Sequence, residues 1–129
     1  MLATRNRLRA SADFSNTVRS GVRNGRRNLV LYAATTAATE PTQVGFIVAK
    51  TVGNAVVRNL VKRRLREAAA FTVRSHPTGL KIVVRALPAA AGSDWAALLN
   101  DYRSACFKAV NRLAGSVSAG TEEEGTKTP

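Results

Sequence analysis

The segment from Val52 to Glu67 restricts the possible folds of this chain more than any other. Apolar and basic residues alternate in it with helical spacing, and Gly53-Asn54 marks the expected start of the helix. At about 100° per residue, one arc of about 140° is polar and mostly cationic. That arc holds Arg58, Asn59, Lys62, Arg63 and Arg66. The opposite arc must pack on a sheet, and it holds Val57, Leu60, Val61, Leu65, Ala68 and Phe71.

The polar arc is predicted to bind a partner, because a solvated surface usually mixes both charge signs. No acidic residue occurs between Lys50 and Arg66. Arginine forks and an asparagine amide suit phosphates and bases. Arg64 falls within the apolar arc, so its head is expected to snorkel outward or to mark the edge of the helix.

The charge of the whole chain also points to a polyanionic partner. Twenty Lys and Arg stand against eight Asp and Glu in 129 residues, which gives a net charge of +12 and a pI near 11.4. This balance is typical of nucleic-acid-binding proteins and not of neutral metabolic enzymes. Arginine-rich coding bias can also raise the pI, but here the basic residues cluster in residues 1–27 and 50–66.

A membrane is the other partner that this charge allows, and the sequence argues against it. Membrane-surface binding usually needs a basic helix with exposed bulky apolar residues. No apolar run approaches the length of about 18 residues expected of a spanning helix, and the N-terminus lacks the apolar stretch of a secretory signal. The single cysteine excludes an internal disulfide and fits a reducing compartment. We therefore expect a cytoplasmic protein.

The element pattern predicts an α+β fold, a two-layer sandwich in which helices pack on a small mixed sheet. The expected order is a helix, two strands with an optional third, a helix, a strand and a helix. The first helix should be capped by Ser11 and end near Gly21, and the last should be capped by Ser93 or Asp94. The expected strands are Asn28–Thr36, Thr42–Lys50 and Leu80–Leu87, and the basic helix should end near Val73. One domain spans residues 1–114, and residues 115–129 form an acidic tail expected to be disordered.

The residue inventory argues against catalysis by this chain alone. One histidine, His76, lies in a predicted loop, which excludes a two-histidine ribonuclease. Cys106 lies on the apolar side of the last helix and is expected to be a buried thiol. The acidic residues show no paired spacing, and no phosphate-binding loop or metal-ligand spacing occurs. We expect no catalytic residue, no metal site and no cofactor held by this chain.

The few aromatic residues divide between the core and a possible cleft. Phe46, Phe71 and Trp95 are expected in the core. Tyr32 lies on the strand face opposite Leu29 and Leu31. With Phe14 on the first helix it would either line a cleft where unpaired bases stack, or pack in the core. The sequence pattern leaves these two alternatives open.

The run from Lys50 to Glu67 closely resembles the signature of the bacterial ribonuclease P protein subunit. The family pattern reads K-K-x-G-N-A-V-x-R-N-x-x-K-R-x-x-R-E, and its helix is known as the RNR motif. The stretches RNRLRASADF, LVLYA, VGFIVAK and IVVRALP resemble the family as well, so that the resemblance covers nearly the whole domain. The residues after Gly115 lie outside it.

The resemblance implies a role for each matching position. Residues at the positions that contact the catalytic RNA subunit are Arg58, Asn59, Lys62, Arg63 and Arg66, with Lys50 and Asn54 at flanking positions of the signature. A central cleft, which holds the single-stranded 5′ leader of precursor tRNA in the family, would include Phe14, Val18 and Tyr32. The family also shares a left-handed βαβ crossover through this helix, against the usual handedness.

Three positions depart from the family pattern. Leu60 replaces an arginine of the RNR motif, and Thr51 replaces the second lysine before the helix. Val18 stands where the cleft often has an aromatic residue, so stacking would depend more on Phe14 and Tyr32.

The resemblance implies a protein subunit of an endonuclease whose RNA subunit, with Mg²⁺, hydrolyses the phosphodiester bond and releases the mature tRNA 5′ end. The chain would bind one catalytic RNA and the precursor tRNA, and neither DNA nor membrane. The main alternative is a ribosomal or tRNA-binding module without a catalytic RNA partner. A DNA-binding protein ranks third, because no helix-turn-helix pair is expected, and a stand-alone nuclease ranks last.

Overall fold

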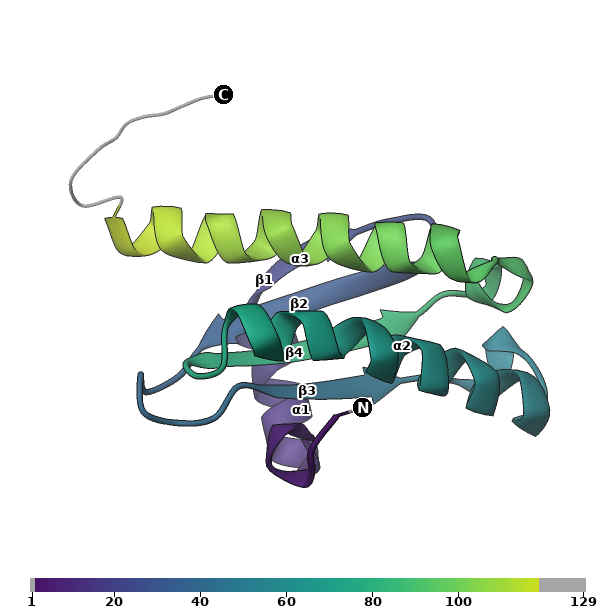
Figure 1. The fold of residues 1–129 in the computed structure, drawn as a ribbon, viewed down its shortest axis with the longest axis horizontal. Coiled ribbons are helices and arrows are strands. Elements are labelled where there is room, and N and C mark those ends of the chain that lie inside the picture. Colours follow the sequence, from purple (N-terminus) through teal and green to yellow (C-terminus); the bar gives the residue numbers. More distant parts are fainter. Residues whose placement is uncertain (1, 119–129) are drawn as a thin grey trace.

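The computed structural model describes residues 2–118, which form a four-stranded sheet and three helices (Figure 1). The elements are α1 (Ser11–Ser20), β1 (Val22–Gly25), β2 (Leu29–Thr35), β3 (Gln43–Ile47), α2 (Ala55–Ser75), β4 (Leu80–Ala86) and α3 (Trp95–Ser118). Short 3₁₀ turns occur at Thr4–Asn6, Lys50–Val52 and Pro88–Gly92. The predicted α+β class with a small mixed sheet is confirmed.

The sheet has the strand order β1-β2-β4-β3. The pairs β1–β2 and β2–β4 are antiparallel, whereas β3 and β4 are parallel and are joined through α2. In Figure 1, β3 and β4 both run from left to right, β4 lies above β3, and α2 crosses in front of the sheet. This arrangement makes the β3–α2–β4 connection left-handed, against the usual rule for such units and as the family resemblance implies.

Apolar residues fill both faces of the sheet, and the strand alternation decides which face each one occupies. The larger core lies under α2 and α3 and includes Leu29, Leu31, Leu65, Ile82, Val84 and Leu98. The smaller core lies under α1 and consists of Leu8, Val30, Tyr32 and Val83, with Phe14 and Val18 packed against it. Tyr32 therefore faces α1, opposite Leu29 and Leu31, as the alternation predicts.

Helix α2 begins at the predicted position and packs with the predicted face. The Val57 amide donates a hydrogen bond of 3.0 Å to the Asn54 side chain, which caps the helix. Val61 and Leu65 are buried on the sheet. Arg64 lies at the edge of this face, and its guanidinium donates to the carbonyl oxygen of Ser93 at 3.0 Å. The side chain thus extends outward from the apolar arc, one of the two outcomes expected for it.

Phe71 is a correction to the predicted core, because it is 39% exposed. It lies at the margin of the apolar arc of α2, and α3 packs beside α2 through more central positions. The Thr72 hydroxyl, one residue further, forms a hydrogen bond of 2.7 Å with the Tyr102 hydroxyl in the buried seam between the two helices. Phe71 is therefore left at the outer edge of that seam.

The other corrections concern the ends of elements. Ala10, not Ser11, occupies the N-cap of α1, and its methyl side chain caps no amide. Strand β3 ends at Ile47, because the chain turns into the 3₁₀ segment Lys50–Val52. Strand β1 is not among the three strands predicted by residue range, because Val22–Gly25 has only one apolar residue and so shows no alternation. Helix α3, whose first turn is capped by Asp94, continues past residue 114 to Ser118, and residues 119–129 of the expected tail lie outside the described residues.

Candidate nucleic-acid interface

The outward face of α2 carries cations that have no acidic partner. Residues 2–118 contain two ion pairs, Lys81–Asp13 at 3.0 Å and Arg26–Asp101 at 3.7 Å, and neither involves α2. The basic face, defined as Arg58, Asn59, Lys62, Arg63 and Arg66, is exposed or half-buried. Its positive charge is therefore not neutralised by the described part of the chain and is free to act on a polyanion.

The turn before α2 fixes the first arginine of this face. The Arg58 side chain donates from Nε to the carbonyl oxygen of Gly53 at 3.2 Å, which leaves the other guanidinium N–H groups free. A side chain at position 53 would place its Cβ 2.8 Å from Val57 Cγ1, so this close turn requires glycine. The Gly53-Asn54 pair thus sets both the helix start and the position of Arg58.

A hollow of about 200 Å³ joins the basic face to the N-terminal segment. Lys62 and Arg66 line it from α2, and Arg7 and Arg9 line it from the segment before α1. Phe14 of α1 forms an aromatic part of its wall. The helix face and the predicted cleft are therefore parts of one continuous surface.

A second and larger hollow, of about 420 Å³, runs along α1. Phe14 and Val18 line it together with Ile47, and Arg19 and Arg85 add two cations. We call the two hollows together the α1–β3 cleft. It combines apolar and aromatic walls with arginines, the combination that single-stranded nucleic acid needs for stacking and phosphate contacts.

Phe14 is positioned by a glycine on the neighbouring strand. Its ring lies directly over Gly45 of β3, where a Cβ would come within 2.5 Å of Phe14 Cε1. Any side chain at position 45 would displace the ring from the sheet. Gly45 thus keeps Phe14 low in the cleft, with one part of the ring packed on the smaller core and another part open to the hollow.

Tyr32 lies beneath the cleft, in the core on which Phe14 and Val18 pack. Its side chain belongs to the smaller core and is 6% exposed. Arg85 Cζ lies 5.9 Å from the centre of its ring, on the side toward the cleft. The structure thus brings Phe14, Val18 and Tyr32 together, but only the first two line the open hollow.

Two flanking positions of the signature lie just before α2. Lys50 is exposed in the 3₁₀ turn before α2. Asn54 uses its Oδ1 atom to cap the helix, so only its amide N–H groups are available to a partner. Of the departures, Leu60 is half-buried on the side of α2 away from the polar arc, and Thr51 is exposed.

Sequence reasoning missed the cleft arginines Arg7, Arg9, Arg19 and Arg85. A signal for one of them was present: Arg85 interrupts an apolar strand two residues after Val83, so strand periodicity puts it on the face of Tyr32. The other three come from segments whose position depends on how the N-terminus folds back over β3, and no local pattern encodes this.

Cys106 lies in the core, where the sequence pattern predicts a buried thiol. Cys106 is buried 3.4 Å from the Thr72 hydroxyl, and burial raises the pKa of its thiol. A raised thiol pKa disfavours the thiolate that would attack a substrate. Within residues 2–118, no three His, Cys, Asp or Glu side chains lie close enough to hold a metal ion. No helix in this range is long and apolar enough to cross a membrane.

Comparison with known proteins decides the family. The model of the ribonuclease P family matches residues 2–110. The chain belongs to the ribonuclease P protein family. Membership makes it an RNA-binding subunit of a ribonuclease P and places it in tRNA processing.

Similar bacterial proteins are ribonuclease P protein components. The ribonuclease P protein component of Pseudarthrobacter chlorophenolicus is 65% identical, over 98% of each chain. That of Kocuria rhizophila is 58% identical over 88% of this chain and all of its own length. The first of these alignments spans nearly the whole chain, so it includes the basic face and the cleft.

Solved ribonuclease P proteins have the same fold. The Staphylococcus aureus RNase P protein is 28% identical and superposes with a TM-score of 0.73, covering 81% of this chain and 94% of that one. The Thermotoga maritima RNase P protein, at 23% identity and a TM-score of 0.67, supports the fold alone, over 78% of this chain and 94% of that one. The left-handed connection and the mixed sheet of this chain thus belong to a fold that it shares with solved ribonuclease P proteins.

Proposed function

We propose that the basic face of α2 binds the catalytic RNA subunit and that the α1–β3 cleft holds the 5′ leader of precursor tRNA. The observation that supports this most directly is the continuity of the two surfaces. Lys62 and Arg66 belong to the basic face and also line the hollow that contains Phe14. One RNA can therefore lie on α2 while a second strand enters the cleft beside it.

The chemistry of the cleft fits a leader of variable sequence. The ring of Phe14 and the apolar surface of Val18 and Ile47 offer contacts that any base can use. Arg19 and Arg85 are suited to phosphates, which carry no sequence information. The cleft would thus hold a single strand with little preference for its bases.

Phosphodiester hydrolysis is assigned to the RNA subunit. The cleft residues offer no general base, since arginine stays protonated and the nearby Asp13 is paired with Lys81. The described side chains do not fit a Mg²⁺ site either, because no cluster of carboxylates faces the cleft. We infer that Mg²⁺ is held by RNA phosphates, and that the protein assists by binding the substrate and neutralising phosphate charge.

We further propose one protein per catalytic RNA. The basic face and the cleft together form a single surface around the edge strand β3, with no repeated copy elsewhere in the described residues. A ribosomal or tRNA-binding module would share the charge but would have no reason to combine this face with a single-strand cleft.

Cleavage of precursor tRNA at low Mg²⁺ tests this function. We expect the ribonuclease P RNA to cleave slowly alone and much faster with this chain, because each neutralised phosphate contributes affinity that Mg²⁺ would otherwise supply. An unrelated RNA-binding protein of similar net charge is the control. If that protein stimulates cleavage equally, or if the chain has no effect while binding unrelated RNAs equally well, the proposal is wrong.

A further inference from the structure

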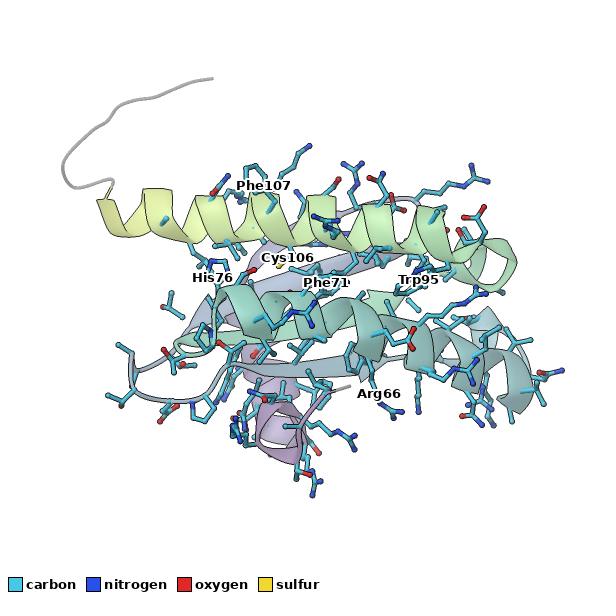
Figure 2. The ribbon with its side chains drawn as sticks, in the orientation of Figure 1. Arg66, Phe71, His76, Trp95, Cys106 and Phe107 are labelled. Carbon is cyan, nitrogen blue, oxygen red and sulfur yellow. The ribbon has the colours of Figure 1, made fainter. Side chains whose placement is uncertain are left out.

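A second aromatic and cationic site lies between α2 and α3, away from the α1–β3 cleft. The exposed aromatic side chains within residues 2–118 are Phe71 and Phe107, which are 39% and 68% exposed. With His76 and Arg103 they border a hollow of about 200 Å³ between the two helices. Figure 2 shows Phe71 between α2 and α3, whereas Arg66 projects from the opposite edge of α2. The width of α2 therefore separates this α2–α3 groove from the cleft.

Arginines are stacked on the ring at the centre of the groove. The guanidinium carbon of Arg74 lies 4.7 Å from the centre of the Phe71 ring, and that of Arg103 lies 5.6 Å from it. A guanidinium held over a ring is both a flat surface and a set of phosphate donors. Phe107 stands one helical turn after Arg103, and its ring has no cation–π partner in the described part of the chain. Flat surfaces and cations are thus combined at one place.

The floor of the groove holds α2 and α3 in a fixed relation. The Thr72 hydroxyl forms hydrogen bonds with the Tyr102 hydroxyl at 2.7 Å and the Cys106 thiol at 3.4 Å. These three side chains are buried and line the groove from below. Because both helices are tied at this level, the spacing of the two helices that carry the exposed rings is set before any ligand binds, which lowers the entropic cost of binding.

The charge of the groove selects the kind of partner. Its lining includes Arg103 and His76 but no acidic residue, and Arg74 adds a further cation at its rim. A second copy of this chain, docked by the same groove, would bring these cations against one another. A polyanion with flat apolar groups satisfies both features, and single-stranded RNA is such a ligand.

We propose that the α2–α3 groove binds an unpaired RNA nucleobase, which stacks on the exposed ring of Phe107, while Arg74 and Arg103, held over the Phe71 ring, bind its phosphates. This site is additional to the α1–β3 cleft and does not depend on where the leader lies. The bound strand belongs either to the catalytic RNA or to the precursor tRNA, and these share the same chemistry.

A fluorescent ring introduced at position 107 reports on the groove directly. The Phe107→Trp variant of the full chain keeps a flat ring at an exposed position, and the parental chain, whose one tryptophan is Trp95, supplies the baseline. Titration with a short unstructured RNA oligomer should quench the added fluorescence of the variant saturably. The matching abasic oligomer, with the same phosphates and no bases, should produce little quenching. Equal quenching by both strands, or none by either, would overturn the proposal.

Substitutions then separate stacking from apolar docking and from general charge. Phe107→Leu keeps apolar bulk but has no flat ring. A crosslink formed specifically in the groove measures how tightly the oligomer binds to the parent and to this variant. The variant should bind about 5-fold to 150-fold more weakly than the parent. Arg103→Gln, combined with Phe107→Trp, should weaken the quenching titration. Arg27→Gln in the same background, an equal charge loss at an exposed site on the β1–β2 turn, should not. Full retention of binding in Phe107→Leu would show an apolar docking groove instead and would contradict the proposal. Fluorescence emission of the Phe107→Trp variant that changes with protein concentration alone would indicate self-association, and it would contradict the proposal as well.

The Phe107→Trp variant also identifies the source of the strand. Quenching on addition of the catalytic RNA alone assigns the base to that RNA, and quenching that requires precursor tRNA assigns it to the substrate. Quenching by the free oligomer but by neither of these RNAs in the assembled complex would contradict a role in ribonuclease P.

Discussion

At the scale of single residues, several side chains in the signature have a structural task besides any contact with RNA. The Asn54 side chain accepts a hydrogen bond from the Val57 amide at the start of α2, and the Arg58 side chain donates a hydrogen bond to the Gly53 carbonyl oxygen. Each of these hydrogen bonds orients the basic face before RNA arrives. Loss of RNA binding on substitution of Asn54 would therefore report on the helix start as well as on a direct contact.

Asn54→Ala should lower the free energy of unfolding by about 1 kcal/mol, because the first turn of α2 loses its cap. Denaturant unfolding of the free protein measures this. Asn54→Asp retains the capping oxygen and should keep the stability of the parent. Equal stability of the alanine variant and the parent would show that the cap contributes nothing.

Tyr32→Ala should destabilise the protein by about 3–5 kcal/mol, because a large buried side chain is removed from the smaller core. Tyr32→Phe keeps the ring and should stay close to the parent. The expected result follows from burial, so it distinguishes a buried core residue from an exposed stacking residue. A variant that unfolds like the parent but binds the leader less tightly would return Tyr32 to the binding surface.

At the scale of elements, α2 has three sides with different partners. The core side packs on the sheet, the basic face is open, and the Phe71 side borders α3. Arg63 and Arg64 show how sharply these sides divide. Arg63 is exposed and forms no ion pair in the described residues, whereas its neighbour donates to the Ser93 carbonyl at 3.0 Å.

Arg63→Gln should reduce the salt dependence of binding to the ribonuclease P RNA by about 0.7–0.9 in the slope of log K against log salt, for one phosphate contact. Arg64→Gln removes the same charge one residue later and is the matched control. It should leave the slope unchanged and slightly lower the stability of the protein. Identical slopes for Arg63→Gln and the parent would remove Arg63 from the interface.

Helical and strand periodicity predicted most of these elements, and its failures have physical causes. The spacing in Val52–Glu67 placed the core side and the basic face of α2 correctly, and the alternation in β2 placed Tyr32 opposite Leu29. Phe71 was predicted wrongly, because a helical wheel gives the direction of a side chain but not where the neighbouring helix ends. The cleft arginines before α1 depend on long-range packing of the N-terminal segment over Gly45, which no local spacing records.

At the scale of the whole molecule, the left-handed β3–α2–β4 connection determines which surfaces meet. It places α2 over the edge strand β3, so that Lys62 and Arg66 reach the hollow that the N-terminal segment shares with Phe14. The basic face and the cleft then border one another without any shared stretch of sequence. A family resemblance implied this connection, whereas local pattern and the usual handedness rule would have predicted the opposite one.

The two surfaces should also be separable by substitution. In the complex with the ribonuclease P RNA, the parent should bind leader-bearing precursor tRNA more tightly than mature tRNA. A cleft variant with Phe14→Leu and Arg19→Gln should lose most of this preference and keep its affinity for the RNA subunit. Arg63→Gln should do the reverse.

The ratio of the dissociation constants for mature tRNA and leader-bearing precursor tRNA, measured at one salt and one Mg²⁺ concentration, tests the central claim most directly. The proposed division of surfaces predicts a ratio well above one for the parent and for Arg63→Gln, and a ratio near one for the Phe14→Leu and Arg19→Gln variant. A cleft variant that keeps the full ratio of the parent while remaining folded would contradict it.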